Sequence, residues 1–391
     1  MKIAMIGQKG IPCRFGGIER HVEELTKGLV AEGHEIFVYA RKEYTPLQVK
    51  EFEGVHIVHM PSLRTKHLDT ITYTFAATMH ALFQGYNVIH YHGVGPSLLS
   101  FIPRILKPKV KVVATIHCLD RLVSKWGLFA KFMLGVGEWA ACTFPHKTIT
   151  VSRSLQDYIQ SRFGKNTVCI SNGIPAQIEN EDPSRTLRDT FGLEAGEYIL
   201  NVSRFIPSKN VDMLIRAWKK TKNIHNKKLV LVGDSSMGSH EYKSKLMKLA
   251  DHDDDILFLG WQQMKELQVL YAGACVYVHP SSAEGLSTTI LEAFSQGALV
   301  LMADIAGNRE ISSDRRFFFE DGDLESLVEG LVRVIETKEE TKDAVSKMRE
   351  HVIATYGWPT LIFKLIEFYS HCISETKQRE FSKKYSYTYD K

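Results

Sequence analysis

The chain of 391 residues is 44% hydrophobic and 24% charged, which is typical of a soluble globular protein and long enough for two domains. Its net charge of +4 is mild, so it excludes a nucleic-acid coat and predicts no nucleic-acid partner. Six cysteines without a C-x-x-C pair, no secretory signal and no apolar run of about 18 residues predict free thiols in a cytoplasmic protein without a membrane span.

In the first half of the chain, short apolar runs alternate with longer helical patterns. This order predicts βα units and parallel sheets, so the expected fold class is α/β. The predicted strands are Lys2–Ile6, Glu35–Ala40, Val55–Met60, Val88–Tyr91, Lys111–Ile116 and Thr148–Val151.

Two glycines follow the first predicted strand and open an amphipathic helix. Gly16 and Gly17 would let the backbone approach a phosphate whose charge the helix N-terminus receives, although a tight turn alone would also require glycines. The spacing is not G-x-G-x-x-G, and the second strand ends at Arg41 and Lys42, where an NAD enzyme usually places an acid. NADP stays open, because a basic residue can accept its extra phosphate.

His117 directly follows the predicted strand Lys111–Ile116, at the kind of strand end where α/β sheets bind ligands. It is either a ligand-binding residue or a hydrogen-bonded structural one, and His92 and Asp120 share this geometry. The segment 121–144 mixes cations with aromatic residues. It predicts a helix that contacts an anionic membrane surface or a lipid-linked substrate, with a core helix whose cations face solvent as the alternative.

A change of composition near residue 175 separates the two halves. A polar, acidic stretch follows Ile174, and the alternation of apolar runs then restarts. We expect a first domain over 1–175, a second over 190–356, and a final helix over 357–380 that joins the first domain. The predicted strands of the second half are Tyr198–Val202, Leu229–Val232, Ile256–Leu259, Ala274–Val278 and Ala298–Met302.

Arg204 and Lys209 follow the first predicted strand of the second half. Two cations just beyond a strand end suit a diphosphate, because Arg offers a planar fork and Lys a point charge. Exposed basic residues in a loop are common, so this pair alone is weak evidence for a diphosphate site. The two glutamates in the same half of the chain, described next, strengthen the prediction.

The stretch from Glu284 to Glu292 joins a strand end to an apolar helix. About 12 Å would separate the two carboxylates along a helix, so they would grip different parts of one long ligand rather than flank one bond. A helix with surface acids at its ends is the alternative. The helix N-terminus would offer backbone donors from Gly285, Leu286, Ser287 and Thr288.

A cluster of aspartates would suggest a metal site by its D-x-D spacing. The cluster precedes a predicted strand, however, whereas ligands bind beyond strand ends. We therefore expect a solvated acidic turn and assign no metal to Asp251, Asp253, Asp254 and Asp255.

Together, the E-x7-E element, the S-R-x-x-P-x-K-N loop, the early G-G-x-E turn and His117 resemble the retaining GT-B glycosyltransferases of family 4 over nearly the whole chain. The resemblance implies two Rossmann-like domains with doubly wound parallel sheets that face a central cleft. It also implies a nucleoside-diphosphate sugar as donor substrate, no separate cofactor and no catalytic metal.

In the second domain, the resemblance implies that Glu284 contacts the donor sugar and Glu292 the ribose diol. Arg204 and Lys209 would hold the diphosphate. The residues after Glu284 read Gly-Leu-Ser-Thr-Thr, where many relatives have Gly-Phe-Gly-Leu-Pro. This departure leaves the identity of the donor open.

In the first domain, the resemblance implies that Gly16 and Gly17 cap the diphosphate and that His117 lies beside the transferred sugar. The expected acceptor is a saccharide or a lipid-linked intermediate of a surface polysaccharide, met in the cytoplasm or at the inner face of the membrane. The alternatives are a GT-B nucleotide-sugar epimerase, an NADP-dependent oxidoreductase and a sugar-nucleotide sensor without turnover.

Overall fold

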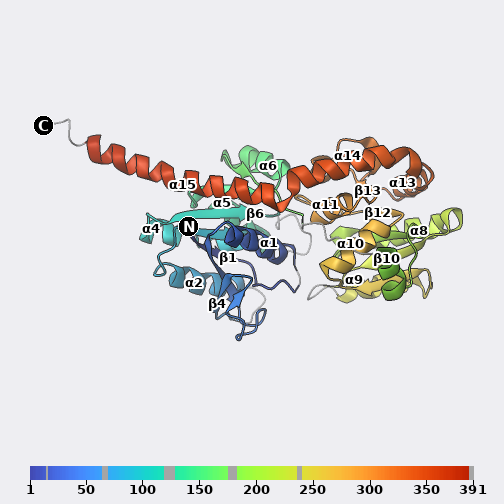
Figure 1. Cartoon of the computed structure of the whole chain (residues 1–391), viewed down its shortest axis with the longest axis horizontal. Helices are drawn as coiled ribbons and strands as arrows, with labels where there is room; N and C mark the ends of the chain where they lie inside the picture. The colour runs from blue at the N-terminus through green and yellow to red at the C-terminus, as the bar shows by residue number, and fades with distance from the viewer. Residues whose placement is uncertain (15, 64–68, 119–127, 175–182, 236–239, 387–391) are drawn as a thin grey trace. The chain divides into compact units, whose positions relative to one another are not determined.

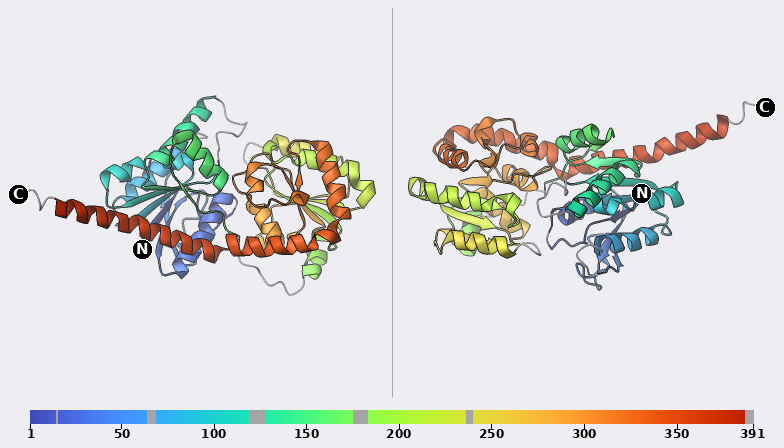
Figure 2. Two further views of the ribbon diagram at one scale, coloured as in Figure 1. Left: turned by 90° about the horizontal axis from the view of Figure 1, so that it is seen from above. Right: turned by 180° about the vertical axis from the view of Figure 1, so that it is seen from behind.

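The computed structural model describes the chain except for residues 15, 64–68, 119–127, 175–182, 236–239 and 387–391. It consists of two compact units: the first holds Met1–Gly173 and Trp358–Lys391, and the second holds Ile174–Gly357. Each unit is a mainly parallel sheet covered by helices (Figures 1 and 2). In the ranges that the structure describes, no helix has the length and apolar character needed to cross a bilayer.

The sheet of the first unit has the strand order β3-β4-β2-β1-β5-β6-β7-β8, and all neighbours are parallel except β3 with β4. Every residue of β5 and β6 is buried, as expected for strands with helices on both faces. The strands are β1 (Lys2–Ile6), β2 (Glu35–Arg41), β3 (Glu51–Phe52), β4 (Val55–Met60), β5 (Val88–His92), β6 (Lys111–Ile116), β7 (Lys147–Thr150) and β8 (Val168–Cys169).

The order of this sheet reverses at β1, which lies between β2 and β5. Ligands of α/β sheets bind outside the carboxyl ends of the strands at such a point. Gly7 follows β1 with φ of 120°, and a Cβ atom there would lie 2.4 Å from the carbonyl oxygen of His92. Only glycine therefore fits between these two strand ends. The helices are α1 (Gly17–Ala31), α2 (Asp69–Ala81), α3 (Val94–Ser97), α4 (Phe101–Leu106), α5 (Leu128–Thr143) and α6 (Arg153–Phe163).

Helix α15 (Trp358–Ser386) completes the first unit although it is last in the sequence, and it packs along α1 (Figure 1). Leu361, Leu365 and Tyr369 recur every four residues and form its buried stripe. A Cβ atom on Gly28 of α1 would lie 1.8 Å from Cδ1 of Ile362, so glycine permits the close packing of the two helices.

The sheet of the second unit has the order β11-β10-β9-β12-β13-β14 and is entirely parallel. Here too the order reverses, at β9, which lies between β10 and β12. The strands are β9 (Tyr198–Val202), β10 (Lys228–Val232), β11 (Ile256–Gly260), β12 (Val276–His279), β13 (Val300–Ala303) and β14 (Phe318–Phe319). The main helices are α8 (Val211–His225), α9 (His240–Ala250), α10 (Met264–Gly273), α11 (Thr288–Ser295), α12 (Ala306–Arg309), α13 (Leu324–Glu336) and α14 (Lys338–Tyr356).

Both units thus have the Rossmann-like, doubly wound form, and the predicted α/β class is confirmed. Several strand predictions need a correction of their bounds by one or two residues, and one of these corrections affects the site. The run Ala274–Val278 becomes β12 over Val276–His279, because Ala274 is the C-cap residue of α10 and belongs to the connection. The strand consequently ends at His279, whose side chain enters the site described below.

Candidate functional site

Two loops at the carboxyl edge of the second sheet are bonded to each other. They follow β9 and β12, which are neighbouring strands. Nδ2 of Asn210 donates to the carbonyl oxygen of Pro280 over 3.0 Å, and the backbone N–H of Ser282 donates to the carbonyl oxygen of Ser208 over 3.2 Å. These bonds hold the two loops in a fixed relation at the strand reversal, where ligands of such sheets bind.

An ion pair joins the same loops. Nζ of Lys209 donates to Oε1 of Glu284, and both side chains are only 14% exposed. Nε2 of His279 lies 3.0 Å from the same carboxylate oxygen. Nδ1 of His279 lies 3.0 Å from the hydroxyl of Tyr277, which in turn donates to Thr289 over 2.8 Å. This chain of polar contacts fixes the Glu284 carboxylate just before α11.

The charges of this group follow from its surroundings. Burial alone would raise the pKa of Glu284, but the charge of Lys209 and the hydrogen bond from His279 outweigh it and hold this pKa well below its usual value. Burial lowers the pKa of His279 and outweighs the opposing effect of Glu284, so the ring is neutral at neutral pH. The neutral ring then donates from Nε2 to the carboxylate.

Glu292 lies within α11 and is 3% exposed. The hydroxyl of Tyr271 donates to Oε2 of Glu292 over 3.1 Å. Since Glu284 is also mostly buried, the interpretation of the pair as surface acids on a helix is wrong. Burying a carboxylate is unfavourable unless partners compensate, so both positions require a specific environment.

The backbone groups predicted to bind a ligand lie where α11 begins. Ser287 is the N-cap residue and Thr288 the first residue of this helix. Leu286 and Ser287 are buried, and Gly285 is partly exposed. The structure therefore brings the predicted backbone donors, Glu284 and Lys209 together on one edge of the second unit.

Arg204 follows β9 and is exposed. It belongs to the same loop as Lys209, which ends a 3-10 turn over Pro207–Lys209. The neighbouring residue Ser203 packs closely on Gly233, where a Cβ atom would lie 1.9 Å from the Ser203 carbonyl oxygen. The loop that carries both predicted diphosphate ligands is thus anchored at its first residue.

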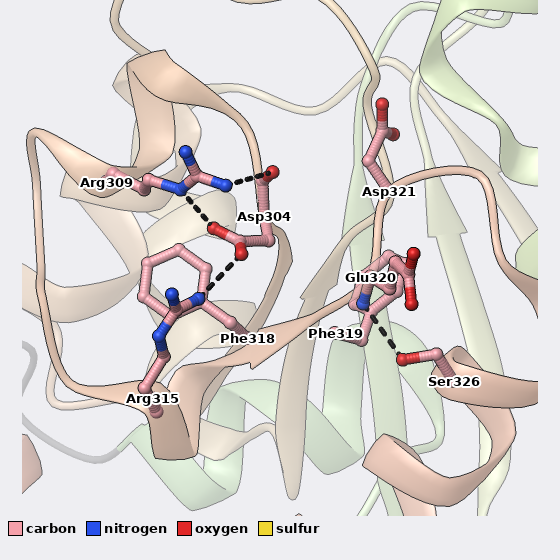
Figure 3. Close-up of a pocket in the computed structure, with 8 residues that line it drawn as sticks. All are labelled: Asp304, Arg309, Arg315, Phe318, Phe319, Glu320, Asp321 and Ser326. Atoms are coloured by element: carbon pink, nitrogen blue, oxygen red, sulfur yellow. Dashed lines mark hydrogen bonds and ion pairs between the residues drawn. The ribbon is translucent and has the colours of Figure 1, made fainter.

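A polar pocket of about 490 Å³ lies at the carboxyl ends of β13 and β14 (Figure 3). Asp304 accepts from Nε of Arg309 over 2.5 Å and from Arg315 over 2.6 Å, so both guanidinium groups already hold a partner. The pocket adjoins the Glu284 loop through Gly307, where a Cβ atom would lie 2.7 Å from the Glu284 carbonyl oxygen. The residues that line it include none of the site residues predicted from the sequence.

In the first unit, Gly16 precedes α1 with φ of 111°. A Cβ atom there would lie 1.9 Å from Oε2 of Glu19, a buried side chain that accepts the Lys9 backbone N–H over 3.0 Å. A Cβ atom on Gly17 would have no neighbour within 4 Å. The turn therefore explains Gly16 but not Gly17, beside which there is open space.

His117 lies after β6 in a group of aromatic rings. Its Nε2 lies 3.2 Å from Nδ1 of His92, and its ring is 4.9 Å from the ring of His21. The Asn172 side chain raises the pKa of both His21 and His117, against the larger effect of burial. Burial lowers the pKa of His21 to about 4 and the pKa values of His92 and His117 well below 6.5, so the three rings are neutral at neutral pH.

Arg41, the cation at the end of β2, is engaged inside the first unit. It forms an ion pair with Asp69, donates to Thr70 over 3.3 Å and is 12% exposed. A nucleotide 2′-phosphate would have to displace Asp69 from this guanidinium. The NADP alternative therefore depends on the exposed Lys42 rather than on Arg41.

Part of the predicted membrane segment, and Asp120, lie outside the described residues. Within 121–144, the structure describes a helix from Leu128 to Thr143, α5. Phe132 is 66% exposed and Trp139 is 45% exposed. Large apolar side chains of this segment therefore face solvent.

The acidic turn before β11 has a cationic partner. Nζ of Lys222 lies 2.8 Å from a carboxylate oxygen of Asp253 and 2.8 Å from one of Asp255. The prediction of a surface turn without a ligand fits this arrangement, in which the acids neutralise a lysine.

Several residues that shape these sites were not predicted from the sequence. His279 ends a strand directly before Pro280, and the strand-end rule used for His117 could have found it. Tyr271 and Gly307 carry no such signal, because they reach Glu292 and Glu284 only through the fold.

Comparisons with known proteins match both halves of the chain. Residues 15–177 match the family described as Glycosyltransferase Family 4, and residues 184–351 match Glycosyl transferases group 1. An uncharacterized glycosyltransferase of Methanocaldococcus jannaschii is 26% identical over 388 residues, covering 94% of this chain and 98% of that protein. The gpi3 subunit of phosphatidylinositol N-acetylglucosaminyltransferase from Schizosaccharomyces pombe is 23% identical over 381 residues. This match covers 93% of this chain and 79% of that protein.

A solved structure shares the fold. The crystal structure of HepE from Anabaena in complex with UDP and glucose has a TM-score of 0.79 and 21% sequence identity, covering 95% of this chain and 100% of that one. At this identity the likeness concerns the fold alone, which is that of Rossmann-like domains.

Proposed function

Because the chain belongs to the GT-B glycosyltransferases of family 4, group 1, we propose that it moves a sugar from a nucleoside-diphosphate sugar to a hydroxyl acceptor with retention of configuration. The observation that carries this proposal is the meeting of Lys209 with Glu284 at the start of α11. Such a site offers a cation and backbone donors to a diphosphate and a carboxylate to sugar hydroxyls.

The reaction breaks the bond between the anomeric carbon and a phosphate oxygen. Negative charge then develops on the diphosphate, and oxocarbenium character develops on the sugar. Arg204 and Lys209 would stabilise that negative charge, and the backbone N–H groups at the start of α11 would add fixed donors. The acceptor oxygen would attack from the side that the diphosphate leaves, and its proton would pass to a diphosphate oxygen.

The remaining residues would position the donor. Glu284 would bind hydroxyls of the transferred sugar, and Glu292 would bind the ribose diol. Gly17, with open space beside its backbone, would approach the diphosphate together with Gly16. His117 would lie beside the transferred sugar, as a neutral ring able to hydrogen-bond a hydroxyl. No catalytic metal is part of this proposal.

We place the acceptor in the class of lipid-linked or surface saccharides, met at an anionic membrane. An exposed apolar group supports this: Phe83, Ile105 and Leu106 are 74%, 69% and 57% exposed. Lys107 lies 5.7 Å from the Phe83 ring. Apolar side chains next to cations bind anionic lipid surfaces. Sedimentation with anionic vesicles should be lost in Ile105→Glu/Leu106→Glu, and undiminished sedimentation would exclude this surface.

The donor assignment can be tested by calorimetric titration with UDP, GDP, dTDP and NADP without added metal. We expect one nucleoside diphosphate to bind and Glu292→Ala to abolish that binding. Glu329→Ala, an exposed glutamate on α13, is the matched control. Preference for NADP, or equal binding by Glu292→Ala, would contradict the proposal.

Turnover separates a transferase from its closest alternative. Arg204→Ala and Lys209→Ala should each slow transfer at least tenfold, which corresponds to about 1.4 kcal/mol of barrier. An epimerase would convert the nucleotide sugar without any acceptor, and nuclear magnetic resonance of the donor alone would reveal it. Near-normal turnover in both folded variants would refute the diphosphate role.

A further inference from the structure

Three histidine side chains converge in the first unit: His21 from α1, His92 from the end of β5 and His117 from the loop after β6. We propose that they bind one transition-metal ion of the zinc type. Each ring offers one nitrogen atom, and these atoms all lie within 4.8 Å of one another. Across the described ranges, this is the one group of three or more potential metal ligands that lies so close together.

The spacing of the rings is near that of a zinc site. Zinc–nitrogen bonds of about 2.0–2.1 Å in a tetrahedron separate the ligand atoms by about 3.4 Å. Nδ1 of His92 and Nε2 of His117 are already 3.2 Å apart. Closing the widest separation from 4.8 Å to about 3.4 Å would require a shift of about 1.4 Å, which rotation of one side chain can supply.

Nδ1 of His92 and Nε2 of His117 form a hydrogen bond with each other, which a metal ion would replace, whereas both ring nitrogens of the adjacent His90 are bonded to hydroxyl groups. The ring of His90 lies 4.2 Å from that of His92, but its Nδ1 lies 2.6 Å from the Tyr369 hydroxyl and its Nε2 lies 2.7 Å from the Thr115 hydroxyl. Nε2 of His92 lies 3.5 Å from the sulfur atom of Met5, which is a weak hydrogen-bond partner. Metal binding would require the proton between Nδ1 of His92 and Nε2 of His117 to move to the other nitrogen of its ring, so that both atoms present a lone pair.

His21 supplies an independent indication. It is 8% exposed, and its Nδ1 has no hydrogen-bond partner among the described residues. A buried nitrogen without a partner is unfavourable, and an ion or water is one of the few ways to satisfy it. The ring of His21 also lies 4.9 Å from that of His117 and 5.9 Å from that of His92, so all three rings face one small region.

The ligand set indicates the class of ion. Imidazole nitrogen binds zinc, copper, nickel and cobalt, whereas magnesium and calcium prefer oxygen. Three protein ligands leave a fourth position for water or a substrate hydroxyl. The site is therefore distinct from a magnesium ion that would bridge a donor diphosphate.

Metal binding would also affect turnover, and this consequence rests on the proposed function. An ion on His117 would occupy the ring predicted to contact the transferred sugar. Zinc should then slow transfer without changing the affinity for the nucleoside diphosphate, whose predicted ligands lie in the second unit. If zinc binds these histidines but leaves turnover unchanged, the metal site stands and the role of His117 fails.

The direct experiment is titration of the chelator-treated full chain with Co²⁺ and Zn²⁺. We expect one equivalent of Co²⁺ to give the visible absorption of a four-coordinate nitrogen site, and Zn²⁺ to displace it. His21→Gln and His117→Gln should each weaken metal binding at least tenfold. His252→Asn is the control, because His252 is exposed and its φ of 54° suits asparagine.

Two results would overturn the proposal. The first is undiminished binding in His21→Gln and His117→Gln, with circular dichroism showing both to be folded. The second is a sulfur-to-cobalt charge-transfer band, which would place the ion on some of the six cysteines. Binding of less than one equivalent of metal by all variants alike would also contradict the proposal, because it would indicate weak binding to surface groups.

Discussion

Nε2 of His279 lies 3.0 Å from Oε1 of Glu284, so the last residue of β12 holds the carboxylate that begins the E-x7-E element. If Glu284 binds the donor sugar, loss of this hydrogen bond should slow transfer. His279→Leu should lower kcat at least tenfold, about 1.4 kcal/mol, whereas His279→Gln keeps a donor and should retain most activity. Nucleoside-diphosphate affinity should hold in both, and equal kcat values for Leu and Gln would exclude a positioning role.

The lowered pKa of His279 predicts a pH dependence of stability. Its folded-state pKa lies below the ordinary 6.5, so the unfolded state binds more protons in the window between the two values. The contribution is complete above about pH 6.5 and is lost as pH falls toward the folded pKa, by at most about 1.4 kcal/mol per pH unit. Urea unfolding at about pH 7.5 and about pH 5.5 should show a smaller difference for His279→Gln than for the unaltered protein.

Glu284 affects stability in a different pH range from His279. Its pKa is lowered below the ordinary 4.5, so its contribution is present above that value and is lost only as pH falls further. Glu284 stays ionised between about pH 7.5 and about pH 5.5 in both the folded and the unfolded state. A change in stability over this range therefore cannot arise from Glu284. If His279→Gln leaves the slope unaltered, His279 is not the titrating group.

Removal of Lys209 should leave the Glu284 carboxylate buried without its cation. Lys209→Met should destabilise the second unit by about 3 kcal/mol, because one partner of a mostly buried pair is lost. Adding Glu284→Gln should recover about 1–2 kcal/mol, since the uncompensated charge disappears. Hydrogen exchange over residues 276–295 measures both effects locally. Additive losses in the double variant would mean that the pair is not coupled.

Tyr271 should matter to nucleotide affinity although it carries no charge. Its hydroxyl donates to Glu292 over 3.1 Å, and both side chains are buried. Tyr271→Phe should weaken nucleoside-diphosphate binding by about 1–2 kcal/mol, roughly fivefold to thirtyfold, because the predicted ribose ligand loses a fixed partner. Calorimetric titration measures this change, with kcat at saturating donor as the control. Unchanged affinity would contradict the proposal that Glu292 binds the ribose of the nucleotide.

Gly307 should tolerate no side chain. A Cβ atom there would lie 2.7 Å from the Glu284 carbonyl oxygen and 2.8 Å from that of Gly285, and both are backbone atoms. Gly307→Ala should therefore displace the loop, costing about 1–3 kcal/mol of stability and weakening donor binding. Gly95→Ala is the control, since its nearest atom, on Thr70, is 3.8 Å away. Equal thermal stability of the two variants would contradict this account.

The strands could be predicted where they are buried on both faces. The sequence predicts Lys2–Ile6, Lys111–Ile116 and Tyr198–Val202 with the bounds that the structure has, because continuous apolar runs between polar turns mark such strands. The two-residue strands β3, β8 and β14 were not predicted. A two-residue pairing has no periodicity, so only the neighbouring strand defines it.

Some residues of the candidate site could likewise be predicted from the sequence, and others could not. Lys209 and Glu284 could be predicted because each follows a strand end in its own loop, and their pairing follows from β9 and β12 being neighbours. The three-histidine group could not be predicted as a group. His21 lies on a helix 71 positions before His92, and only the sheet order brings α1, β5 and β6 together.

The return of the chain at Trp358 has a consequence for synthesis on the ribosome. Ile174 pairs with Gly357, so the second unit starts and ends at one place, while Leu361, Leu365 and Tyr369 belong to the first core. The ribosome must therefore finish the whole second unit before the first core can close. At about 5–20 residues per second, the nascent first unit would wait roughly ten seconds or longer with an uncovered apolar face. The first 173 residues alone should then be a client of chaperones rather than a stable domain.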